Sequence, residues 1–201
     1  MAREIYVSVD VEADGPVPGL HSMLSLAAVA QTAGGGELAA FSKNLQPLAD
    51  ATAHPATSAW WRGHPHAYAE ATRAPEDPRA VMAAFDAWVR ALPGVPVLVA
   101  YPVAFDALFV RYYAQRFVGG SPFGHCALDI QSYAMGVRGT RFGQAKARHL
   151  PQALVPDDGG SGRHVALADA RRQGRVFAAL MRERAGRSGR HRTSGVCDSD
   201  A

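Results

Sequence analysis

Two carboxylates, Asp10 and Glu12, stand two residues apart in the stretch Ile5 to Pro16, which begins as a run of β-branched residues. Residues two apart on a β-strand point to the same face, so both acids face the same way at the end of a predicted strand. Two anions held side by side in an apolar setting lose hydration and repel each other. A shared divalent cation would offset that repulsion, and solvation at a frayed strand end is the alternative.

Three further residues complete a set with Asp10 and Glu12. Asp106 follows the apolar run VPVLVAY near the start of a predicted helix, and His164 and Asp169 lie five residues apart where the last predicted helix begins. At about 100° per residue the latter two cannot share one helix face, so we expect His164 on the loop before the helix. Alone, Asp106 could favour a helix dipole and His164 could be a cap. Together, four carboxylates and an imidazole suit metal-assisted hydrolysis of a phosphodiester.

The elements that must position these residues are strands followed by alternating helices and strands. The apolar patterns predict a three-stranded antiparallel meander at the start of the chain. A helix, a strand buried on both faces and a second helix come next, and a final helix closes the pattern, which is typical of an α/β layer fold. The expected helices span residues 78–92, 105–117 and 166–184, and the expected strands span residues 5–11, 22–31, 37–45 and 95–101.

Two segments between these elements could contact a ligand. Residues 51–74 are rich in His, Pro and aromatic residues, and they contain the adjacent Trp60 and Trp61 in predicted short helices. Adjacent residues cannot share a helix face, so one indole could be core while the other faces a groove and stacks on a base; alternatively both fill a gap beneath a loop. The connection 136–162 carries Arg138, Arg141, Lys146 and Arg148, which makes it the expected segment for gripping a polyanion.

Composition limits the other possibilities. With 201 residues and 48% hydrophobic content, we expect one domain over residues 1–185 and a disordered basic tail over residues 186–201. The formal net charge of +3 permits a polyanionic partner. No apolar run approaches the roughly 20 residues that span a bilayer, so no membrane association and a cytoplasmic location are expected. The two cysteines, Cys126 and Cys197, support neither a disulfide framework nor a cysteine zinc site.

In order and spacing, these motifs resemble those of the DEDDh 3′-5′ exonucleases of the ribonuclease H-like superfamily. The chain carries D-x-E at Asp10 and Glu12, FD at Asp106, and H-x4-D at His164 and Asp169. The resemblance covers residues 5–184 and implies a ribonuclease H-like mixed sheet flanked by helices. SVDVEADGP, SMLSLAAVA, the tryptophan pair and AYPVAFDALFV are similar to bacterial exoribonucleases related to ribonuclease T and mycobacterial ribonuclease AS. Those enzymes lead into the second motif with a Gly-His-Asn type sequence, where this chain has Ala-Tyr-Pro-Val.

The resemblance also implies roles for individual residues. Asp10 would bridge two Mg²⁺ or Mn²⁺ ions, Glu12 and Asp169 would hold the first ion, and Asp106 would support the second. His164 would take a proton from the attacking water as general base. Leu24 or Met23 would wedge against the terminal base, with core packing as the alternative. The expected substrate contacts are Ala13, Asp14, Ser22, Met23, Leu24 and Trp61.

These inferences lead to an expected function. We expect an enzyme that releases nucleoside 5′-monophosphates from the 3′ end of single-stranded nucleic acid, with RNA favoured by the resemblance and a homodimer as the assembly. A DNA 3′-5′ exonuclease is one alternative, and a catalytically silent nucleic-acid-binding module of the same fold is another. Four converging carboxylates would repel phosphate, which argues against the silent module.

Overall fold

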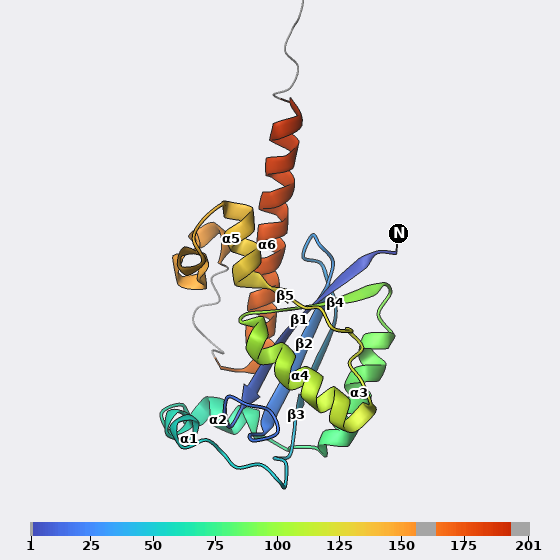
Figure 1. Ribbon diagram of the computed structural model, residues 1–201, viewed down its shortest axis with the longest axis vertical. Coiled ribbons are helices and arrows are strands. Elements are labelled where there is room, and N and C mark those ends of the chain that lie inside the picture. The colour runs from blue at the N-terminus through green and yellow to red at the C-terminus, as the bar shows by residue number, and fades with distance from the viewer. Residues whose placement is uncertain (1, 156–163, 194–201) are drawn as a thin grey trace, which may run out of the picture.

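A mixed five-stranded sheet forms the centre of the molecule, and helices cover both of its faces (Figure 1). The computed structural model describes residues 2–155 and 164–193, with side chains described as far as residue 187. The strands are β1 (Glu4–Ala13), β2 (Met23–Gln31), β3 (Glu37–Asn44), β4 (Val95–Ala100) and β5 (Leu128–Asp129). The helices are α1 (Pro55–Arg62), α2 (Pro65–Ala71), α3 (Pro78–Arg90), α4 (Val103–Val118), α5 (Ile130–Arg138) and α6 (Ala166–Thr193).

The strand order is β3-β2-β1-β4-β5, which places β1 at the centre of the sheet. β1, β2 and β3 pair antiparallel, as the meander prediction requires, while β4 pairs parallel to β1 and β5 parallel to β4. The three-stranded meander and the strand β4 are therefore confirmed, although only the last three residues of β4, Leu98 to Ala100, are buried. The central position of β1 matters because its carboxyl end carries Asp10 and Glu12.

The side chains of β1 alternate between two packed layers. Ile5, Val7, Val9 and Val11 are buried in a core cluster with residues of α3 and α4, among them Phe85 and Phe109. On the opposite face Tyr6 packs in a second cluster with Phe177 of α6. Because successive strand residues face opposite sides, Ser8, Asp10 and Glu12 share the α6 face with Tyr6. The period-two pattern thus directs both acids toward α6.

Two predicted segments are more ordered than expected. The connection 136–162 begins inside α5 and continues as three short 3₁₀ segments between Phe142 and Leu154, up to the limit of its described part. Helix α6 runs to Thr193 and extends beyond the sheet (Figure 1), so it continues past residue 185, where the expected domain ends. There Arg187 forms an ion pair with Glu183 one turn earlier, which can extend a helix that has no apolar stripe. Residues 194–201 lie outside the described residues.

No helix within residues 2–155 and 164–193 is long and apolar enough to cross a membrane.

Gly174 allows α6 to approach the sheet closely. Its carbonyl oxygen accepts a 2.7 Å hydrogen bond from the buried Gln31 side chain on β2. A Cβ at position 174 would lie 2.9 Å from Gln31 Oε1 and 3.3 Å from Ser8 Cβ on β1. The absence of a side chain therefore sets the distance between α6 and the two strands, and with it the position of the helix residues that face Asp10.

Replacing Gly174 with Ala should lower the free energy of unfolding, because the added methyl group overpacks a close contact at a cost of about 1 to 3 kcal/mol. The roughly 1 kcal/mol that Ala ordinarily gains over Gly in a helix offsets part of this cost, so a net loss of about 1 kcal/mol is expected. Gly186 is a matched control on the exposed part of the same helix, where a Cβ meets no atom within 4 Å. Urea denaturation should show Gly186→Ala to be neutral or stabilising. Equal stability of Gly174→Ala and the wild type would contradict the packing argument.

Candidate active site

Three elements bring the predicted acids to one place at the carboxyl end of β1. Glu12 on β1 and the pair His164 and Asp169 at the start of α6 offer ligand atoms that all lie within 4.8 Å of one another. Asp106 reaches the same region from the first turn of α4, where its buried Oδ1 accepts a 2.9 Å hydrogen bond from the Val11 N–H. The prediction that His164 lies on the loop before the last helix is confirmed, since His164 precedes α6 and Asp169 lies in its first turn.

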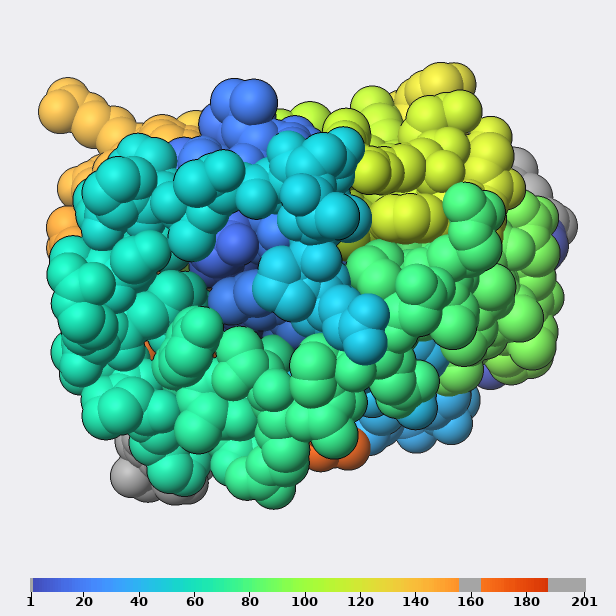
Figure 2. All heavy atoms as spheres, turned by 90° about the horizontal axis from the view of Figure 1, so that it is seen from below, coloured from blue at the N-terminus to red at the C-terminus, as the bar shows by residue number. Residues whose placement is uncertain are grey.

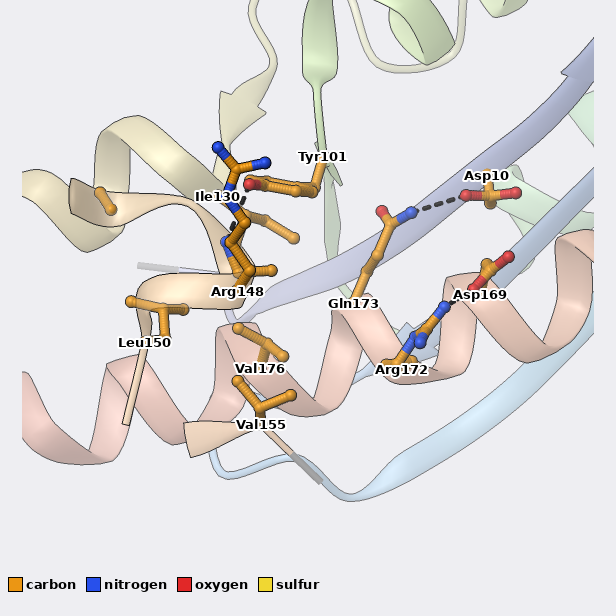
Figure 3. Close-up of a pocket in the computed structure, with 12 residues that line it drawn as sticks. Asp10, Tyr101, Ile130, Arg148, Leu150, Val155, Asp169, Arg172, Gln173 and Val176 are labelled. Carbon is orange, nitrogen blue, oxygen red and sulfur yellow. Dashed lines mark hydrogen bonds and ion pairs between the residues drawn. The ribbon is translucent and has the colours of Figure 1, made fainter. Parts of the chain in front are cut away.

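Asp10 is held by a residue that the sequence analysis did not identify. Gln173 on α6 donates a 2.6 Å hydrogen bond from Nε2 to Asp10 Oδ1 (Figure 3). Gln173 follows Asp169 by four residues and so lies on the same helix face, which is the one signal in the sequence that could have pointed to it. Arg172 is a second unexpected neighbour, because it pairs with Asp169 Oδ1.

The pKa values of these acids are raised because charged forms are disfavoured in this setting. Burial raises the pKa of Glu12 to about 8, and the charges of Asp169 and Asp106 add to the effect. Burial likewise raises the pKa of Asp106 to about 7, although the Val11 N–H opposes the shift. The pKa of Asp10 lies well above its usual range through burial first and then through the neighbouring carboxylates. The fully ionised set therefore needs a compensating positive charge at neutral pH.

The residues present fit divalent cations. Carboxylate oxygens are the ligands that hard ions such as Mg²⁺ prefer. Asp106 Oδ2 is a buried oxygen with no hydrogen-bond partner among the described residues, although the other oxygen of the same carboxylate is bonded. A buried acceptor without a donor is unfavourable unless a ligand satisfies it. The raised pKa values and this oxygen together support a cation site built from the predicted acids.

His164 is fixed at both its main chain and its ring. Its backbone N–H donates a 2.7 Å hydrogen bond to Asp169 Oδ2, and its φ of 60° lies in the left-handed region that residues other than glycine seldom occupy. The imidazole contacts Trp60, with ring centroids 4.8 Å apart and planes at 85°, and His64, at 5.2 Å and 73°. An exposed indole near a ligand groove was one of the two alternatives for the tryptophan pair, whereas no sequence pattern pointed to His64.

The residues expected to contact substrate are all buried, and two of them have other roles. Met23 is fully buried in the main core cluster and its N–H donates to Tyr113 Oη, an arrangement that agrees with the packing alternative, while its substrate contact stays a prediction. Ser22 is also buried, and its Oγ accepts a 3.1 Å hydrogen bond from the Leu48 N–H. Ala13 presents its carbonyl oxygen to the Trp61 Nε1–H at 3.0 Å. These contacts place Ser22 and Met23 behind the surface.

The remaining three, Asp14, Leu24 and Trp61, line a pocket of about 840 Å³. Figure 2 shows the corresponding face hollowed, with the segment before α1 and the helices α1 and α2 around atoms of the N-terminal part. The two adjacent tryptophans lie on different faces of α1, as one of the alternatives for the pair requires. Trp61 is 5% exposed and Trp60 is 39% exposed. The substrate contact expected of Trp61 stays a prediction, and Trp60 is the indole that contacts His164.

A second pocket, of about 370 Å³, opens beside the acids on the side of α5 and α6 (Figure 3). Asp10 and Asp169 lie at one part of its wall, and Arg148 from the predicted basic connection lies at another. Arg138 of the same connection is instead paired with Glu183 at 2.8 Å. Of these two basic residues, Arg148 is therefore the one placed beside the site.

Without divalent cations, stability should fall as pH rises from about 4.5 to 8. A carboxyl whose pKa is about 8 when folded and 4.5 when unfolded leaves the folded state holding more protons in that interval, so ionisation favours unfolding. Urea denaturation in EDTA at several pH values should show this fall, and Glu12→Gln should reduce it. Taking the difference between the wild type and this variant cancels the contribution of acids that do not interact with Glu12. A difference that does not change with pH would contradict the raised pKa of Glu12.

No family model matches the chain. The 3′-5′ DNA exonuclease Cap18 of Escherichia coli is 31% identical over 178 residues, which are 87% of this chain and 90% of Cap18. The nuclease domain of 3′hExo, a DEDDh family member bound to rAMP, has a TM-score of 0.70 at 13% identity, over 90% of this chain and 93% of that domain. E. coli exonuclease I in its complex with single-stranded DNA has a TM-score of 0.67 at 17% identity.

The match to exonuclease I covers 96% of this chain but 43% of exonuclease I, so the chain spans less than half the length of that enzyme. These two structural likenesses establish the ribonuclease H-like exonuclease fold that the sequence motifs implied. The finer similarity to ribonuclease T and ribonuclease AS stays a prediction. The structural likeness to 3′hExo shows the fold of a DEDDh family member. The identity to Cap18 extends over most of both chains, and it shows that this chain belongs to the family of 3′-5′ exonucleases that includes Cap18.

Proposed function

We propose that this protein removes nucleoside 5′-monophosphates from the 3′ end of single-stranded DNA with the help of two divalent cations, Mg²⁺ or Mn²⁺. The observation that carries the proposal is the convergence of Glu12, His164 and Asp169 within 4.8 Å, next to two further acids with raised pKa values. A catalytically silent binding module would gain nothing from such a cluster, because the acids repel the phosphates of a bound strand.

The choice of DNA rests on the relatives rather than on the acids. Cap18 is named a DNA exonuclease, and exonuclease I was crystallised with single-stranded DNA. The sequence resemblance favoured RNA. The rAMP bound to 3′hExo is the observation that supports RNA. Cap18 carries more weight because it is the relative whose sequence is 31% identical over most of the chain. The homodimer expected from the sequence stays a prediction.

The proposed roles follow from the contacts around each acid. Asp10, Glu12, Asp106 and Asp169 would hold the cations, which when bound would stabilise the attacking and leaving oxygens of the phosphoryl group. Gln173 keeps Asp10 oriented, and the Val11 N–H keeps one oxygen of Asp106 occupied. Arg148, whose cationic side chain lines the pocket beside the acids, would contact backbone phosphates.

His164 is the proposed general base. Its imidazole lies beside Glu12 and Asp169, so it can accept a proton from a water molecule that attacks the phosphorus from this side. The hydrogen bond from the His164 main chain to Asp169 ties the base to an acid of the cation site. Movement of the base relative to the cation ligands is thereby limited.

The sugar preference can be measured directly. DNA and RNA oligonucleotides of one sequence, labelled at the 5′ end, should be shortened stepwise from the 3′ end, and the DNA should be shortened faster. EDTA should stop the reaction, and Mg²⁺ or Mn²⁺ should restore it. Equal or faster shortening of RNA would overturn the choice of DNA while leaving the exonuclease in place. If neither strand is shortened, the proposed function is wrong.

Substitutions of Asp10 and His164 should lower activity for different reasons. Asp10→Asn should abolish activity and weaken cation binding together, because a ligand charge is lost from the site. His164→Ala should slow single-turnover hydrolysis by about 10²- to 10⁴-fold, the usual effect of losing a general base, while calorimetry shows cation binding retained. Because His164 lies among the possible ligand atoms, loss of cation binding in His164→Ala would identify it as a ligand instead.

A further inference from the structure

Two aromatic rings outside the acid cluster contact the proposed base. Trp60 and His64 are stacked on each other, with ring centroids 4.0 Å apart and planes at 22°. Each also meets the His164 ring nearly at a right angle, at 4.8 Å and 5.2 Å. The His164 ring thus contacts the stacked pair and also brings a ring nitrogen near Glu12 and Asp169.

Hydrogen bonds hold this stacked pair in place. His64 Nδ1 lies 2.9 Å from the carbonyl oxygen of Trp60, so Nδ1 is the nitrogen that carries the proton. The His64 ring cannot turn away without losing that bond. Because the bond and the stacking both join His64 to Trp60, the two rings form one unit.

The helix that carries Trp60 is tied to the strand that carries Glu12. At the start of α1 the His54 N–H donates to the Asp14 carbonyl oxygen at 2.8 Å, and near its end the Trp61 Nε1–H donates to the Ala13 carbonyl oxygen at 3.0 Å. Ala13 and Asp14 directly follow Glu12. The stacked pair is therefore fixed relative to the end of β1, whereas His164 enters from the segment before α6.

We propose that Trp60 and His64 are positioning residues that hold the His164 ring in its catalytic orientation. The inference rests on the proposed function. The hydrogen bond to Asp169 acts on the main chain of His164. Trp60 and His64 contact its side-chain ring, so they restrict the torsions that orient the imidazole. A base that can turn away from its water spends less time in a reactive geometry, so the rings would act on the rate of the chemical step.

The main competing role for Trp60 is stacking on a substrate base, since an exposed indole can serve that purpose. The two roles differ in what they change. A stacking platform contributes to substrate affinity whether or not His164 is present. A positioning pair contributes to the rate of hydrolysis, and that contribution requires His164.

A double-mutant cycle separates these roles. Trp60→Ala and His64→Ala should each lower the single-turnover rate at saturating DNA and cation by about 10- to 100-fold. Trp60→Phe and His64→Phe should recover most of the rate because they keep a ring in place. In the His164→Ala background, Trp60→Ala should have little further effect. His66→Ala, which removes an exposed histidine from α2, is the matched control and should leave the rate unchanged.

A second measurement does not depend on activity. In the metal-free protein, the proton NMR signals of the His164 ring should shift when Trp60→Ala removes the ring current of the neighbouring indole, and Trp60→Phe should shift them less. Oligonucleotide affinity in EDTA should stay within about a factor of three of the wild type in both Trp60 variants, since their ring is assigned no share in binding.

The outcomes are distinct. Equal effects of Trp60→Ala with and without His164, or a loss confined to affinity, would overturn the positioning role. If Trp60→Ala does not fold, the His64→Ala and His64→Phe pair decides by the same comparison. A wild-type protein that shortens neither DNA nor RNA would overturn the proposed function, and this inference with it. An active wild type with additive effects would overturn this inference alone.

Discussion

Repulsion among carboxylates at one end of β1 is the constraint on which the rest of the site depends. Asp10 and Glu12 face α6 together, Asp169 approaches from that helix, and Asp106 approaches from α4. The protein lowers the repulsion with neutral and cationic donors: the Val11 N–H, the Gln173 amide and the Arg172 guanidinium. These donors do not cancel it, since the pKa values stay raised. The remaining need for positive charge is what makes the cluster a site for cations.

Much of this arrangement could be predicted from the sequence, because it follows from short-range periodicity. A spacing of two placed Asp10 and Glu12 on one face of a strand, and a spacing of five separated His164 from Asp169. The contacts of Gln173 and His64 could not be predicted, because they depend on how α6 and α2 pack against distant elements. The contact of Trp60 with His164 could not be predicted for the same reason, because the sequence left open which indole of the pair is exposed. The continuation of α6 past residue 185 has no apolar pattern to reveal it, and an ion pair between Arg187 and Glu183 lies there instead.

The choice between DNA and RNA has a different physical origin. The acids act on the phosphodiester group, which both nucleic acids share, so neither their spacing nor their pKa values carry information about the sugar. Recognition of a 2′-hydroxyl requires a contact at the ribose, and the pocket lined by Asp14, Leu24 and Trp61 is the hollow where the terminal nucleotide was expected. Relatives with different substrates can therefore share the whole acid set.

The close approach of α6 at Gly174 restricts how the site can change during evolution. Ser8, Gln31 and Gly174 meet at one point, and a larger side chain at any of the three would push the helix away from β1. Because α6 is rigid, such a displacement would move Asp169 and Gln173 together. Substitutions among the three positions should therefore be correlated in related chains, with a gain in volume at one matched by a loss at another. The sizes of these three side chains would therefore reflect the spacing between α6 and β1 that the site requires, although none of the three takes part in the chemistry.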